Sequence, residues 1–319
     1  MRLWLAPLHG ITLYHFRNCL YRHTKTIKTA ITPFLPIQEV TKLRVKRWTD
    51  VLPENNQGMK IIPQLIGNNP THFVDTVRAL MDLGYEQINW NIGCPAAQIT
   101  RKKRGCGLMP YPQMVEDVVR LTTQQTSCHL SLKMRLGLYD ASESLDIIHR
   151  INNYPLDFLV IHPRLGIQQY EGVPDWEAFE ERSQMSLHPI VYSGDINSVE
   201  IFQQLSSRFP KIQDWMLGRG ILQNPFLAEQ IAAIYENSED NSFLYAQRLI
   251  RFYDDLTETL REHRNEKGTL ANLKELWHYL SFAFQLDEEE QKKIFRINEL
   301  NHFIQETEYI LNTKNNIYY

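Results

Sequence analysis

One pattern repeats along most of the chain: a short apolar segment followed by an amphipathic one. Eight such pairs occur in about 235 residues, the spacing of a (β/α)8 chain. The alternation argues against a sandwich of consecutive strands, and an open doubly wound sheet is the alternative to a barrel. No G-x-G-x-x-G follows the first segment, so a dinucleotide-binding sheet of the Rossmann type has no support. We therefore expect an α/β fold, a TIM barrel. The expected strands are residues 3–8, 29–32, 60–67, 87–91, 130–135, 157–162, 189–194 and 215–218. The expected helices include 14–21, 111–123 and 142–151, with others beginning near residues 71, 198 and 224.

The pattern changes after the polar segment 237–241. Beyond it we find no strand-like segment, and apolar residues recur at helical spacing. We expect a catalytic barrel domain over residues 1–240 and a smaller all-helical domain over residues 241–319, with residues 314–319 fraying. The three expected helices cover about residues 245–260, 273–284 and 294–310.

Composition argues against several classes of protein. A net charge of −3 does not mark a nucleic-acid binder, so a polyanionic partner would need local basic patches. No apolar run could span a bilayer, and the chain begins directly with a strand-like segment, so we expect no membrane anchor and no signal peptide. Four cysteines are too few for a disulfide scaffold in a chain of this length, and they form no C-x-x-C pair, which argues against structural zinc. Reduced thiols in the cytoplasm are the simplest interpretation.

Most expected strands end in polar residues that core packing does not favour. Each has an ordinary explanation alone: such a lysine is commonly solvated, a lone histidine hydrogen-bonded in the core, and a free cysteine a small buried residue. In a parallel barrel these ends meet at one rim, so together they predict a binding and catalytic site. The residues are Gln64, Asn91, Cys94, Lys133, Arg135, His162, Ser193, Gly194, Asp195, Gly218, Arg219 and Gly220.

Two glycine turns follow the last two expected strands. Glycine there can simply satisfy a tight turn. Exposed N–H groups beside helix N-termini also bind phosphate, and the last two loops of a TIM barrel are its usual phosphate site. A phosphate there, with Lys133 and Gln64 across the mouth, fits flavin mononucleotide (FMN), because a cation would stabilise its anionic reduced ring.

Six short motifs follow one another along the expected barrel. They are Ala6-Pro7-Leu8-His9-Gly10-Ile11-Thr12, Pro63-Gln64-Leu65-Ile66-Gly67, Asn91-Ile92-Gly93-Cys94-Pro95 with Gly105 and Gly107, Lys133-Met134-Arg135-Leu136-Gly137, His162-Pro163-Arg164 with Tyr170 and Gly172, and Gly218-Arg219-Gly220 with Asn224-Pro225. In these motifs and their order the chain resembles the bacterial FMN-dependent tRNA-dihydrouridine synthases. Leu273-Lys274-Glu275-Leu276-Trp277 also resembles their C-terminal domain, while Leu8, Pro163 and Ser193 depart from the usual Met, Gly and Asn.

This resemblance implies FMN in the barrel, NADPH as reductant, a uridine of tRNA as substrate, a helical domain that binds tRNA, and a monomer. Hydride would pass from reduced FMN N5 to uracil C6, and Cys94 would protonate C5. FMN would contact Pro7, Leu8, His9, Gln64, Lys133, His162, Ser193, Gly194, Asp195, Gly218 and Arg219. Asn91, Arg135 and Tyr170 would face the uracil. Candidate RNA-phosphate contacts, with a solvated surface as the alternative, are Arg101, Lys102, Lys103, Arg104, Lys42, Arg44, Lys46 and Arg47.

Two other functions stay open. A dihydroorotate dehydrogenase is also an FMN barrel acting on a pyrimidine, but that family has N-x-S-C-P where this chain has Gly93, and it lacks the helical domain. A non-catalytic RNA-binding barrel without flavin would purify colourless. The sequence does not indicate which uridine is modified.

Overall fold

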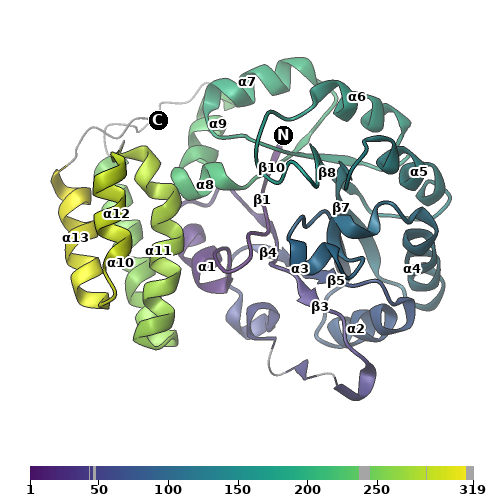
Figure 1. Cartoon of the computed structure of the whole chain (residues 1–319), viewed down its shortest axis with the longest axis horizontal. Coiled ribbons are helices and arrows are strands. Elements are labelled where there is room, and N and C mark those ends of the chain that lie inside the picture. The colour runs from purple at the N-terminus through teal and green to yellow at the C-terminus, as the bar shows by residue number, and fades with distance from the viewer. Residues whose placement is uncertain (43, 46–47, 237–244, 285, 314–319) are drawn as a thin grey trace.

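A computed structural model describes residues 1–42, 44–45, 48–236, 245–284 and 286–313. Over these residues ten strands form one sheet, and every pairing is parallel (Figure 1). The sheet order is β3-β5-β6-β7-β8-β9-β10-β1-β2-β4. The strands are β1 (Arg2–Leu5), β2 (Thr29–Ile31), β3 (Leu35–Pro36), β4 (Lys60–Ile62), β5 (Gln64–Ile66), β6 (Gln87–Ile92), β7 (His129–Gly137), β8 (Leu159–Leu165), β9 (Ile190–Ser193) and β10 (Asp214–Leu217).

The sheet closes through Pro63. Strand β4 pairs with β2, and β5, immediately after Pro63, pairs with β6. The expected single strand 60–67 is therefore wrong in detail, because proline has no N–H for the ladder and divides it in two. The Pro63 carbonyl still accepts the N–H of Asn89 at 2.9 Å, so β4 and β5 together occupy one barrel position. The predicted eight-position TIM barrel is confirmed.

Helices surround the sheet on its outer face (Figure 1). Three of them start at predictable caps: the side chains of Asn69, Asp175 and Ser198 each accept an N–H of the first turn. The short segments α3 and α8 were not expected, and the helix of the sixth strand–helix pair, α6, had no predicted bounds. The helices are α1 (Tyr14–His23), α2 (Pro70–Asp82), α3 (Ala97–Thr100), α4 (Pro112–Gln125), α5 (Ser142–Ile151), α6 (Trp176–Met185), α7 (Val199–Arg208), α8 (Arg219–Gln223) and α9 (Leu227–Glu236). Short 3-10 turns lie at Val40–Lys42, Thr49–Val51, Pro53–Asn55 and Gly105–Leu108.

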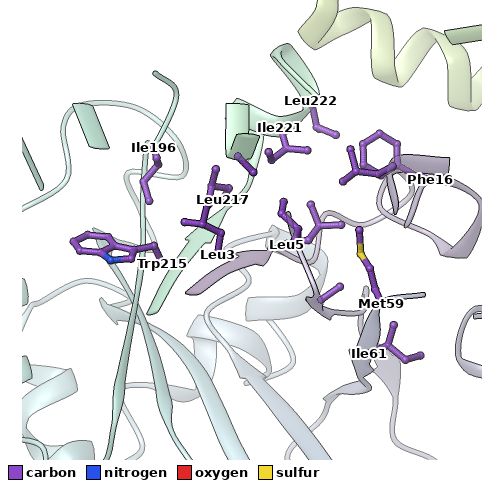
Figure 2. Close-up of a cluster of buried hydrophobic side chains, with 14 of the residues drawn as sticks. Leu3, Leu5, Phe16, Met59, Ile61, Ile196, Trp215, Leu217, Ile221 and Leu222 are labelled. Atoms are coloured by element: carbon purple, nitrogen blue, oxygen red, sulfur yellow. The ribbon is translucent and has the colours of Figure 1, made fainter. Parts of the chain in front are cut away.

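Side-chain alternation along β1 separates two layers of core. Leu3 and Leu5 pack outward against the helical layer, in a cluster that includes Phe16, Trp215 and Leu217 (Figure 2). The intervening Trp4 points into the barrel. There it belongs to a second buried cluster, which fills the interior below the strand ends. Its members are Trp4, Ala6, Ile31, Ile62, Phe158, Val160, Val191 and Met216.

An all-helical C-terminal region follows, as predicted, and packs beside α1 and α8 (Figure 1). The side chain of Asn272 donates to the carbonyl of Gly10 at 2.7 Å, which ties this region to the loop after β1. Among the described helices none is long and apolar enough to cross a membrane. The domain boundary predicted at 240, the linker 237–241 and the tail 314–319 fall outside the described residues. The helices are α10 (Tyr245–His263), α11 (Glu266–Ala283), α12 (Glu288–Arg296) and α13 (Leu300–Thr313).

The predicted single helix over 294–310 is wrong, because the chain breaks between α12 and α13. Ile297 is extended, with ψ 124°. The Glu299 carboxylate accepts the N–H groups of Asn301 and His302 at 2.9 and 2.6 Å, which stabilises a new helix start. Apolar spacing continues across the break, so periodicity alone could not reveal it.

Candidate active site

The carboxyl ends of the barrel strands surround one cavity of about 890 Å³, counted with its open mouth. Most residues singled out in the sequence line it: Pro7, Leu8, His9, Asn91, Cys94, Lys133, Arg135, His162, Tyr170, Ser193, Gly194, Asp195, Gly218 and Arg219. Ala6, Gly93 and Pro95 also line it, although they were named only as parts of motifs. Sequence reasoning missed Pro33, Phe34, Ile196, Asn197 and Met216.

Gln64 does not line the cavity but lies beneath its floor. Its side chain is fully buried and donates to Asn89 at 2.7 Å, while its amide oxygen accepts from Asn91 at 2.8 Å. Asn89 in turn donates to the Ser131 hydroxyl at 2.9 Å. This chain of amides crosses β5, β6 and β7, so Gln64 supports the site from below.

Asn91 shapes the turn that carries Cys94. Its amide oxygen accepts the N–H of Gly93 at 3.0 Å and that of Cys94 at 2.9 Å. The backbone of Gly105 also packs closely against this turn. Gly105 has φ +55°, and a Cβ there would lie 2.5 Å from the Cys94 carbonyl oxygen. Glycine is therefore required at 105, and the thiol sits on a turn held from both sides.

The Cys94 thiol is partly buried among cations. Burial raises its pKa, while the N–H of Ala96 and the charges of Arg135 and Lys133 oppose that rise. The net effect leaves the pKa above its ordinary value, so the group is a protonated thiol at neutral pH. A protonated thiol can donate a proton but is a poor nucleophile.

Two basic groups across the cavity are shifted toward their neutral forms. Burial lowers the pKa of Lys133 to about 8, helped by the nearby charge of Arg135. Burial, with the surrounding cations, also lowers the pKa of His162 well below its usual value, so this imidazole is neutral at pH 7. Among the described residues no carboxylate pairs with Lys133, whose side chain faces the cavity.

Two guanidinium groups approach the Tyr170 ring at the mouth. The Arg135 and Arg219 guanidinium carbons are 5.3 and 5.0 Å from its ring centroid, within cation–π range. Arg135 is nearly fully buried and donates to the Leu165 carbonyl at 2.8 Å. Tyr170 is 49% exposed, so part of it is accessible to an incoming molecule.

Asp195 follows β9 and joins two arginines. Burial raises the pKa of its carboxyl, but the hydrogen bonds and charges of Arg164 and Arg219 outweigh burial, so the pKa lies below its ordinary value. Its backbone has φ +43°, unusual for a residue with a side chain. The glycine turn expected after this strand therefore carries a charged side chain. The Asp195 carboxylate orients Arg219 toward the cavity.

The basic loop after Cys94 lies outside the cavity. Arg101, Lys102 and Lys103 are exposed, and the Lys103 ammonium sits 4.1 Å from the Tyr111 ring centroid. Lys42 is also exposed and pairs with Glu39 at 2.7 Å. Arg104 is partly buried, Arg44 is exposed, and Lys46 and Arg47 lie outside the described residues.

Within the described part of the chain, one group has atoms close enough to hold a metal ion: Cys19, His23 and Asp255, where α1 meets α10. Both Asp255 oxygens already accept from Arg22, at 2.9 and 3.0 Å, and one accepts from His23 at 2.9 Å. These contacts satisfy the carboxylate as an ion pair between the barrel and the helical region. The absence of a metal stays a prediction.

The family of the chain follows from its sequence match. A family model described as "Dihydrouridine synthase (Dus)" matches residues 4–315. The chain belongs to the dihydrouridine synthase family. It is therefore related to oxidoreductases, which fits a cavity lined by a thiol and by cations at the open end of a barrel.

Curated relatives of this dihydrouridine synthase family member align over most of its length. A tRNA-dihydrouridine(16) synthase of Neisseria meningitidis serogroup A is 27% identical, with 86% of this chain and 84% of the relative covered. That of Aquipseudomonas alcaligenes is 26% identical over 78% of this chain and 82% of its own. The tRNA-dihydrouridine synthase B of Pasteurella multocida is 26% identical, with 74% and 70% covered.

Solved structures share the barrel at much lower identity. Morphinone reductase in complex with tetrahydroNAD is 11% identical, with a TM-score of 0.51 over 76% of this chain and 89% of its own. The old yellow enzyme homologue from Zymomonas mobilis is also 11% identical, with a TM-score of 0.51 over 75% and 89%. At this identity the likeness shows the fold alone.

Proposed function

We propose that this protein reduces the C5=C6 bond of a uridine in tRNA to 5,6-dihydrouridine, with FMN as cofactor and NADPH as reductant. The observation that carries the proposal is the meeting of Cys94, Lys133, Arg135 and His162 at one cavity in a member of this family. A proton donor faces buried cations there, the arrangement needed to protonate a carbanion next to a carbonyl.

The cavity fits a flat, anionic cofactor. A Cβ added to Gly194 would lie 3.2 Å from the His162 ring, tighter than an ordinary contact, so glycine keeps that part of the wall open. The Lys133 side chain offers a cation that no described carboxylate neutralises. FMN would be held by Pro7, Leu8, His9, Lys133, His162, Ser193, Gly194, Asp195, Gly218 and Arg219, with Gln64 supporting the floor.

The protein side chains divide the chemistry between them. A bound reduced flavin would supply a hydride to uracil C6. The Cys94 thiol then gives its proton to C5, and burial keeps that proton in place until it is needed. Arg135 or Lys133 stabilises the negative charge on the uracil carbonyl. Tyr170 and Asn91 face the base, and the Asn91 amide also holds the Cys94 turn.

The proposed substrate is a uridine drawn out of its stack. Reaching the cavity would cost a few kcal/mol of unstacking, offset by contacts to the rest of the tRNA. We assign those contacts to the loop Arg101, Lys102, Lys103 and Arg104, and to the helical domain over residues 241–319. Because several relatives are named for position 16, that position is the one to assay first. The protein would act as a cytoplasmic monomer.

The test is to map dihydrouridine in tRNA from cells lacking the protein, and to restore it in vitro with purified protein, FMN and NADPH. The proposal expects one position to lose dihydrouridine and to regain it. Unchanged tRNA together with activity on free dihydroorotate would instead indicate a dehydrogenase of a free pyrimidine. Colourless protein that does not take up FMN would indicate a non-catalytic barrel.

A further inference from the structure

Arg164 is a buried cation at the end of β8 that the cavity itself does not expose. Its side chain is 1% exposed, and every nitrogen of the guanidinium makes a hydrogen bond. Nε donates to the Glu171 carbonyl at 3.2 Å, and Nη2 donates to the Gly172 carbonyl at 2.7 Å. These two bonds fasten the end of the loop that carries Tyr170.

The same guanidinium reaches the neighbouring turn. Nη1 donates to Asp195 at 3.0 Å and Nη2 donates to its other oxygen, a bidentate pair. Asp195 also binds Arg219, which lies over the Tyr170 ring. Asp195 and Gln169 both have positive φ, at +43° and +49°, so each segment holds a backbone conformation that needs support.

The last contact is with His162. Nη1 of Arg164 lies 3.2 Å from Nε2 of this imidazole. A guanidinium can only donate, so Nε2 must accept, and the single proton of the neutral ring must be on Nδ1. Arg164 therefore selects which nitrogen of His162 can donate a hydrogen bond elsewhere.

We propose that Arg164 is a positioning residue: its forked guanidinium locks the Tyr170 loop against the Asp195 turn and holds His162 as the Nδ1–H tautomer. The proposed role in turnover rests on the proposed function, whereas the tautomer does not. Lysine would keep the charge but lose the fork, because an ammonium cannot make the parallel pair to Asp195.

The experiment compares Arg164→Lys with Arg182→Lys. Arg182 is a matched control, 3% exposed, whose guanidinium holds Ser144 at 3.1 Å and the Ala141 carbonyl at 2.7 Å in the outer helices, outside the cavity lining. Nitrogen-15 NMR of histidine-labelled protein, with His162→Gln for assignment, reads the tautomer directly. We expect a single Nδ1–H form in the wild type and in Arg182→Lys, and mixed forms in Arg164→Lys.

Turnover on tRNA is the second readout. Displacing the loop and turn should lower kcat on the order of 100-fold in Arg164→Lys. Arg182→Lys should keep its kcat. The two variants should have similar thermal stability. If Arg164→Lys fails to fold, the wild-type His162 tautomer decides: an Nε2–H ring overturns the proposal. Equal kcat values for the two variants would overturn it as well. If the wild type has no activity on tRNA, the proposed function fails. The NMR measurement of the His162 tautomer then still tests the positioning role of Arg164 by itself.

Discussion

Replacing Asn91 with alanine tests whether its amide builds the Cys94 turn. The change removes three hydrogen bonds: from the N–H groups of Gly93 and Cys94, and to the buried Gln64 amide. At about 1 kcal/mol of net stability for each bond, we expect a loss of about 3 kcal/mol in the free energy of unfolding. Turnover should fall further than stability explains, because the thiol loses the turn that aims it.

Asn224→Ala is the matched control. Asn224 is also buried, at 1% exposed against 8% for Asn91. Its amide likewise makes three bonds: it accepts from the Phe226 N–H at 2.9 Å and from the Tyr245 hydroxyl, and donates to Gln230 at 2.7 Å. It does not line the cavity. We expect a comparable loss of stability, about 3 kcal/mol, with turnover of the folded protein retained.

The assay pairs urea unfolding of the flavin-free variants with dihydrouridine formation per flavin-loaded protein. Both variants should shift the urea midpoint alike, and only Asn91→Ala should lose activity. Equal activity in the two variants would refute the idea that Asn91 positions Cys94. An unchanged midpoint in Asn91→Ala would refute the hydrogen-bond account of the turn.

Two further predictions concern charge. Because the folded flavin-free protein releases the Lys133 proton near pH 8 while the unfolded chain keeps it to about 10.5, the free energy of unfolding should rise with pH across that window, and Lys133→Met should flatten the rise in pH-dependent urea titrations. An identical pH profile in both proteins would contradict this. Replacing Arg101, Lys102 and Lys103 with glutamine should make the logarithm of the tRNA binding constant fall less steeply with the logarithm of the salt concentration. The slope should change by up to about one unit for each RNA phosphate that the loop no longer neutralises. The control is the same change at exposed lysines that lie at or next to the opposite strand ends, which should leave the slope alone: Lys28, Lys60 and Lys211.

Much of this architecture is readable from the sequence because it repeats. The eight strand–helix units, and most polar residues at their ends, follow from short apolar runs and the geometry of parallel barrels. Pro63 shows one limit: it divides the third strand without changing the barrel, since its carbonyl still joins the ladder. Glu299 shows another, because a capping carboxylate interrupts an apolar spacing that otherwise continues.

The contacts that support the site were harder to predict than the residues that line it. Gln64 ends a strand like the other candidates, but its side chain points to Asn89 and Asn91 below the floor, which strand periodicity does not reveal. Arg164 was named only as part of a motif. Its role was not predicted, because its partners come from a loop and a turn elsewhere in the sequence. Phe34 gave no signal, and it enters the site by stacking on His9 at 5.0 Å.

The most direct test of the account is a single turnover of Cys94→Ala loaded with reduced flavin and unmodified tRNA. Cys106→Ala serves as control, because Cys106 is fully buried and lies on the neighbouring turn outside the cavity lining. The account predicts that both variants keep the flavin spectrum and that only Cys94→Ala fails to form dihydrouridine. Dihydrouridine formed by Cys94→Ala at the wild-type rate would contradict it.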